Sequence, residues 1–280
     1  MSPIANNVAK RTSNLCLPSP PLLIIFSESE SLPGPRMETH ILIIAFTSFF
    51  GAAFLKGVTG LGFMSICLPL ISSFIDITVA IPLVIIPSLA SNVIVIAQTR
   101  RAKESVKRFW PLYLSALPGL YVGVSLLHQT GNSIAKAVLG ILSIAYSLYL
   151  LLNVNISVGN KYERFLNVPV GIVNGFLNGL TGTQVMPMLP YLISLQLHRD
   201  LLISAINIGF TVSTLVLLAL LGKFDFLSLD IIGISVIGIV PVALGIYLGS
   251  KLRYRISEGR FRIAVLIILM IIGLNLILNR

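Results

Sequence analysis

Long apolar stretches separated by short polar connections run through most of the chain. Six of these stretches contain about 18 to 23 residues, enough for a helix to cross a hydrocarbon core of roughly 30 Å. They occupy residues 77–99, 109–127, 134–152, 201–221, 231–250 and 261–278. The pattern therefore predicts an all-α, polytopic membrane protein with six full-length spans.

Four further apolar pieces are shorter, and each would extend only about 20 Å as a helix. They form two pairs, at residues 41–55 with 63–75 and 165–177 with 184–196. Each pair is either a re-entrant hairpin or two crossing segments with an irregular connection buried in protein, because lipid does not tolerate exposed unpaired backbone. The prediction is about eight to ten membrane segments in all.

The connection within each short pair carries nearly the same sequence. Phe54–Gly60 reads FLKGVTG, and 122 positions later Phe176–Gly182 reads FLNGLTG. A Gly/Thr-rich break at matching places in two halves of an apolar chain is typical of a transporter binding site, because such sites form where paired helices are interrupted.

The similarity extends beyond these breaks. Segments 54–72 and 176–194 agree at nine of nineteen positions, and at the same offset Gly123 aligns with Gly245. The membrane region is therefore predicted to consist of two repeats, at residues 37–156 and 157–280.

Basic residues gather in the connections 100–108 and 251–262, which the positive-inside rule assigns to the cytoplasm. The first lies between the first and second full spans of its half, and the other lies between the second and third. Equivalent segments therefore face opposite sides, which predicts an inverted repeat with about three full spans and one short helix pair per half. The connection 154–164 is then cytoplasmic too, and both chain ends lie outside.

The amino-acid composition restricts the classes of function that the protein can have. Hydrophobic residues make up 55% of the chain and charged residues 11%, against roughly 25% charged residues in a soluble domain. The net charge of +10 does not indicate nucleic acid, because the basic residues lie between membrane segments rather than on a basic arm. The predicted partners are the lipid bilayer and a small anion, and a homo-oligomer is compatible with the sequence. No metal-ligand spacing, P-loop or hydrolase motif occurs in the sequence, so we predict no enzyme, metal or cofactor.

Residues 1–36 differ from the rest, with six prolines and an apolar patch at 22–26 that is too short to span. We expect this N-terminal extension to be disordered or untranslated, with translation starting at Met37. Mass spectrometry of the native N-terminus tests this expectation, and peptides from upstream of Met37 would contradict it.

The two breaks carry the candidate chemistry. Glycine permits positive φ and close approach of a ligand, and a new helix N-terminus favours an anion. Lys56 would supply a counter-charge, since an ionisable group at membrane depth indicates function. The predicted substrate-binding residues are Lys56, Gly57, Thr59, Gly60, Gly62, Asn178, Gly179, Thr181, Gly182, Thr183 and Gln184.

Each of these features has a structural alternative. The glycines could serve close helix packing, and Lys56 could extend to the membrane surface from a short helix. Other polar residues within spans either line a path or bond neighbouring helices. They are Asn92, Asn174, Asn207, Thr211, Ser213 and Thr214.

The second short helix of each pair contains a proline. The segments are Cys67-Leu68-Pro69-Leu70 and Met188-Leu189-Pro190-Tyr191. With the glycine-rich breaks, this duplicated arrangement resembles the TauE/SafE sulfite exporter family over roughly residues 40–280. The chain departs from the family's run of glycines at Gly60-Leu61-Gly62 and at Gly182-Thr183-Gln184.

The resemblance implies transport of sulfite or another sulfur-containing or organic anion across the bacterial inner membrane. Together with the broken repeat, it predicts a secondary transporter or exporter of a small anion. The alternatives are a passive anion channel, an intramembrane enzyme and a structural membrane partner.

Overall fold

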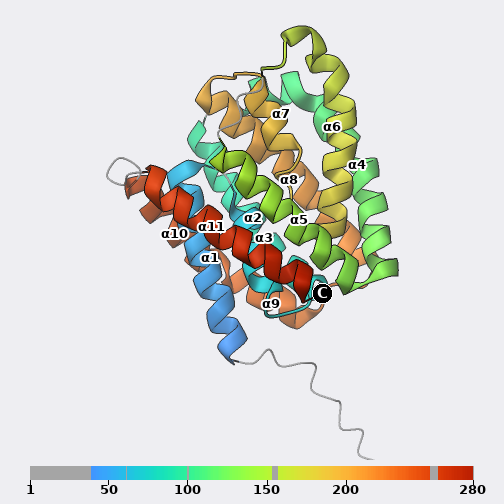
Figure 1. Cartoon of the computed structure of the whole chain (residues 1–280), viewed down its shortest axis with the longest axis vertical. Helices are drawn as coiled ribbons and strands as arrows, with labels where there is room; N and C mark the ends of the chain where they lie inside the picture. Colours follow the sequence, from blue (N-terminus) through green and yellow to red (C-terminus); the bar gives the residue numbers. More distant parts are fainter. Residues whose placement is uncertain (1–38, 61, 100, 153–156, 253–257, 280) are drawn as a thin grey trace, which may run out of the picture. The chain divides into compact units, whose positions relative to one another are not determined.

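The computed structural model describes residues 39–60, 62–99, 101–152, 157–252 and 258–279, and this part of the chain is helical without strands (Figure 1). The predicted extension 1–36 and Met37 lie outside the described residues. The helices are α1 (Thr39–Thr59), α2 (Phe63–Ser72), α3 (Ile77–Thr99), α4 (Ala102–Thr130), α5 (Asn132–Leu151), α6 (Asn160–Thr181), α7 (Met188–Ser194), α8 (Arg199–Lys223), α9 (Leu229–Ile237), α10 (Ile239–Leu252) and α11 (Glu258–Leu278).

The predicted long spans agree well with these helices. Within the described residues, six stretches are long and apolar enough to cross a membrane: α1, α3, α4, α5, α8 and the consecutive pair α9 and α10. Five of them cover predicted spans, and α11 covers the sixth, 261–278. The basic connection 100–108 is shorter than expected, because α4 already begins at Ala102.

The lengths predicted for 41–55 and 165–177 are wrong. α1 contains 21 residues and α6 contains 22, or about 30 Å each, because both helices continue through polar residues at their ends. An apolar run in the sequence ends at a polar residue, whereas the backbone hydrogen bonds of the helix continue through that residue. The other two pieces are short as predicted, with 10 residues in α2 and 7 in α7.

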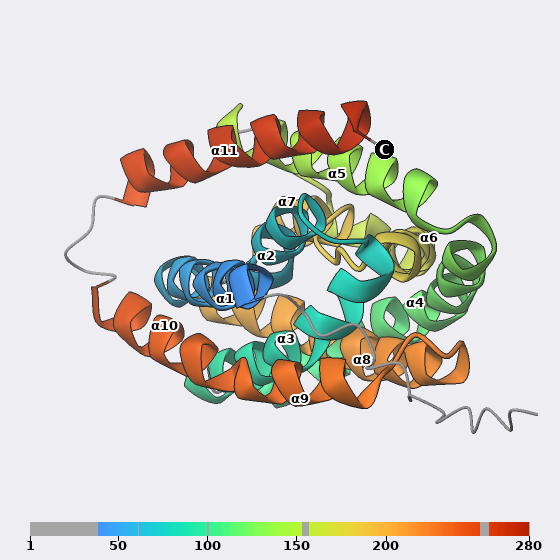
Figure 2. The ribbon, with the colours of Figure 1, turned by 90° about the horizontal axis from the view of Figure 1, so that it is seen from below.

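Each short helix lies beside its long partner. Ahead of α6, the Val158 amide donates to the Ser194 carbonyl at the end of α7 over 3.0 Å, so α7 returns along α6. In the other pair, the ring of Phe63 at the start of α2 lies 6.4 Å from that of Phe49 in the middle of α1. Seen from below, α1, α2 and α7 lie between a layer of α5 and α11 and a layer containing α3, α8, α9 and α10 (Figure 2).

Glycines bring two pairs of helices into backbone contact. α4 packs along α6, where a Cβ on Gly175 would lie 1.9 Å from the Ala116 carbonyl oxygen. α1 packs along α10, where a Cβ on Gly249 would lie 2.2 Å from the Phe54 oxygen. Such close approach is available only to residues without side chains.

The packing corrects one alignment in the repeat. A Cβ on Gly123 would lie 2.2 Å from the Phe176 oxygen. A Cβ on Gly249 would lie at the same distance from the oxygen of Phe54, and Phe54 is the residue that aligns with Phe176. Gly123 therefore takes the place in its helix pair that Gly249 takes in the other, and the alignment of Gly123 with Gly245 is wrong by four residues.

Candidate functional site

The first break separates α1 from α2. α1 ends at Thr59, and Gly60 and Gly62 have φ values of +84° and +90°, in the left-handed region that favours glycine. The Gly60 amide donates to the Lys56 carbonyl over 2.6 Å. Lys56 thus lies in the last turn of α1, directly before the chain reverses.

The Lys56 side chain is buried, with 1% of its surface exposed. Its Nζ donates to Ser91 Oγ over 3.0 Å and to Asn92 Oδ1, both on α3. Ser91 Oγ donates its own proton to the Ser88 carbonyl over 2.7 Å, so it acts as an acceptor toward Lys56. Because Nζ remains inside the protein and its partners lie on a neighbouring helix, the side chain does not extend to the membrane surface.

When Lys56 is charged, two hydrogen-bond donors at this point lack an acceptor among the described residues. An ammonium carries three N–H groups, and Lys56 has two acceptors. Asn92 is 1% exposed and its Nδ2 has no partner among the described residues. Within that same part of the chain, no carboxylate forms an ion pair with Lys56. An ammonium buried here would therefore favour an anion as its partner.

The second break follows α6. Gly182 has a φ of +74°, and its amide donates to the Asn178 carbonyl over 2.7 Å. Thr181 Oγ1 accepts from the Thr183 amide over 3.2 Å, and Gln184 Nε2 donates to Oγ1 of Thr214 on α8 over 2.8 Å. This break is polar but carries no charge.

Asn178 takes the position in α6 that Lys56 takes in α1. It is fully buried, and neither atom of its side-chain amide has a partner among the described residues. Gln184 Oε1 is likewise buried without one. Since a buried amide without partners costs about 1–3 kcal/mol, these groups are also candidates for contact with a polar ligand.

Each break packs against a long helix of the other half. A Cβ on Gly60 would lie 3.0 Å from Ile203 of α8, and Asn207 Nδ2 donates to the Gly60 carbonyl over 3.1 Å. A Cβ on Gly182 would lie 3.0 Å from Ile81 of α3. Ile81 and Ile203 are 122 positions apart, which is also the distance between Gly60 and Gly182.

Two predicted site residues lie in helix contacts instead. A Cβ on Gly57 would lie 2.6 Å from the Ile246 oxygen of α10, and one on Gly179 would lie 2.3 Å from the Leu120 oxygen of α4. The helix-packing alternative describes the surroundings of both glycines. Thr59 is half-buried and donates to the Leu55 carbonyl over 3.0 Å.

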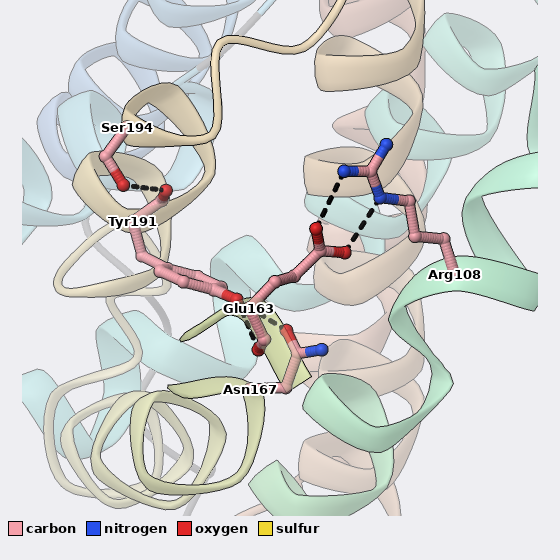
Figure 3. A network of polar contacts seen from close by, with 5 residues as sticks. All are labelled: Arg108, Glu163, Asn167, Tyr191 and Ser194. Atoms are coloured by element: carbon pink, nitrogen blue, oxygen red, sulfur yellow. Dashed lines mark hydrogen bonds and ion pairs between the residues drawn. The ribbon is translucent and has the colours of Figure 1, made fainter. Parts of the chain in front are cut away.

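Sequence reasoning missed one polar network (Figure 3). Glu163 of α6 accepts from Nε and Nη2 of Arg108 of α4 over 2.8 and 2.7 Å. Tyr191 Oη of α7 donates to Asn167 Oδ1 over 2.9 Å and to the Glu163 carbonyl over 3.0 Å. The spacing of Glu163 and Asn167 on one helix face was the available signal. The network ties the second short helix to α4 and α6.

We expect the Arg108–Glu163 pair to stabilise the protein. A double-mutant cycle of Arg108→Gln and Glu163→Gln should give a coupling free energy of about 1 kcal/mol in unfolding, because the contact is bidentate and the carboxylate is 12% exposed. The exposed Arg101–Glu104 pair, also 2.7 Å long, is the matched control and should couple more weakly. Equal coupling in the two pairs would contradict the structural role of the network.

The long apolar helices define a multi-pass α-helical membrane protein, with buried polar groups at the breaks after α1 and α6. The family model described as Sulfite exporter TauE/SafE matches residues 44–276. The chain therefore belongs to the TauE/SafE sulfite exporter family, a family of membrane transporters. Comparisons with curated proteins and with solved structures gave no significant match.

Proposed function

We propose that this protein is a secondary transporter that moves a small anion, sulfite or another sulfur-containing or organic anion, across the bacterial inner membrane. The observation that carries the proposal is the buried Lys56 Nζ beside Asn92, whose Nδ2 has no partner among the described residues. A charged N–H group and an amide N–H₂ group side by side suit the oxygens of a sulfur oxyanion or carboxylate. Family membership supports the same class of substrate.

The second break supplies a neutral polar surface on the path of the anion. Its groups are the side chains of Asn178, Thr181, Thr183 and Gln184 and the backbone at Gly182. The anion binds at Lys56, where the positive charge lies, and passes the uncharged amides when the transporter changes state. Gly60 and Gly62 form the backbone of the charged end.

Reciprocal contacts support an inverted repeat as the basis of alternating access. α4 packs on α6 as α10 packs on α1, and Gly60 meets Ile203 as Gly182 meets Ile81. A two-fold relation between the halves accounts for each pair of contacts. The proposed topology has two hairpins and six further spans, with the connections 100–108 and 251–262 in the cytoplasm.

Flux into proteoliposomes tests the proposal. Labelled sulfite, thiosulfate and methanesulfonate should enter vesicles containing the protein faster than protein-free vesicles, and the initial rate for at least one of them should saturate with concentration. A rate that rises linearly would indicate the passive channel instead. No entry of any of the three anions above the protein-free rate would contradict anion transport of this class.

A further inference from the structure

We propose that the site binds one proton together with each anion, and that Lys56 is the group that accepts it. In the empty site Lys56 is a neutral amine, and in the occupied site it is an ammonium paired with the anion. This inference rests on the proposed function and adds the coupling ion. It follows from the hydrogen bonds around Nζ and from the charges on the surrounding helices.

The empty site has the right number of acceptors for a neutral amine. Ser91 Oγ and Asn92 Oδ1 accept two N–H groups from Lys56. The Ser91 hydroxyl donates its proton to the Ser88 carbonyl, so it does not donate to the amine. A third N–H on Lys56 finds no acceptor among the described residues, and an oxygen of the anion can supply one, so the third proton and the anion would be partners for each other.

Among the described residues, the helices packed on α1 offer Lys56 no compensating negative charge. α3 has no ionisable side chain between Ile77 and Thr99. The ionisable groups of the other helices packed on α1 are buried Cys67 of α2 and exposed Tyr247 and Lys251 of α10. Near Gly60, α8 begins with an exposed cation and an exposed carboxylate, Arg199 and Asp200. An isolated buried ammonium costs several kcal/mol, so the empty site favours the amine.

The binding step balances in protons and charge. As the anion enters, the Nζ lone pair takes up H⁺ from hydronium or buffer acid in the surrounding solution, forming a third N–H that donates to an anion oxygen, and release returns the proton and the anion together. A monoanion thus moves without net charge, and a pH gradient acts on its transport. By linkage, an anion that binds the ammonium raises the proton affinity of Lys56.

Titration calorimetry of the purified protein in two buffers of different ionisation enthalpy measures this proton directly. Sulfite, thiosulfate and methanesulfonate are the probes, with methanesulfonate and thiosulfate chosen because they hold no exchangeable proton near neutral pH. About one proton should be taken up per anion bound. Binding without proton uptake would overturn the coupling but leave the proposed function intact, whereas no binding of any probe would contradict the proposed function.

A second measurement addresses the empty site. NMR of ¹³C-labelled lysine, with the Lys56 signal assigned by its loss in Lys56→Met, should show a neutral amine without anion near neutral pH, and an ammonium there would overturn the proposal. Asn92→Asp places a permanent carboxylate on Nζ, so Lys56 should then stay charged and lose anion binding and proton uptake together. Gln98→Glu, an exposed amide-to-carboxylate change on the same helix, is the matched control and should retain both.

Discussion

Replacing Lys56 with methionine should abolish anion transport and leave the protein folded. Methionine fills nearly the same volume but removes the charge that the anion would pair with, and Ser91 keeps its bond to Ser88. Loss of one partner of a buried charge pair costs about 3–5 kcal/mol, which corresponds to a fall of roughly 10²- to 10⁴-fold in apparent affinity. The measurement is the initial rate of labelled sulfite, thiosulfate or methanesulfonate entry into proteoliposomes over a range of concentrations.

Lys107→Met is the matched control, because Lys107 lies exposed on α4. It removes the same charge and should leave the rate unchanged. The thermal midpoint of Lys56→Met in detergent should match or exceed that of the wild-type protein, because a buried lysine whose partners are all neutral gives little stability. Wild-type rates in Lys56→Met would show that the buried lysine has no part in the site.

The positions of the breaks could be predicted because glycine leaves a local signature. Gly60, Gly62 and Gly182 all adopt positive φ, which other residues rarely do. The lengths of α1 and α6 could not be predicted, because Lys56 and Asn178 end the apolar runs although both helices continue past them. A polar residue can stay within a membrane helix when its side chain has a ligand or a partner on another helix.

The sequence did not predict which side chains form hydrogen bonds or ion pairs between different helices. Lys56 could be identified as deep in the membrane region, but its bonds to Ser91 and Asn92 join residues 35 and 36 positions apart. Arg108 and Glu163 are 55 positions apart, and Arg108 appeared only as one of several basic residues in a connection. Such pairs depend on helix packing, and no local spacing records them.

Two glycines of the repeated motif also have contacts that the sequence could not predict. Gly57 and Gly179 belong to the repeated motif, and their sequence suggested contact with a ligand. In the fold, the sides of these glycines where a side chain would project pack against α10 and α4, respectively. A small residue in a membrane helix permits close approach of either a ligand or a backbone, and only the position of the neighbouring helix decides between them.

Substituting alanine for Gly175 should destabilise the protein more than any surface change. The added Cβ would lie 1.9 Å from the Ala116 oxygen and within 3 Å of two more backbone atoms of α4. Backbone cannot rotate away as a side chain can, so α4 and α6 must separate along their length. Overpacking of this kind costs about 1–3 kcal/mol or more, which should appear as a lower thermal midpoint and a smaller monodisperse fraction in detergent.

Gly233→Ala makes the same chemical change in α9, where a Cβ would have nothing within 4 Å. It should leave the thermal midpoint unchanged or raise it, because alanine favours a helix over glycine by about 1 kcal/mol. Gly249→Ala should behave like Gly175→Ala, since its Cβ would lie 2.2 Å from the Phe54 oxygen, and because it displaces α1 it should weaken anion binding at Lys56 as well. Equal midpoints for Gly175→Ala and Gly233→Ala would contradict backbone contact between α4 and α6.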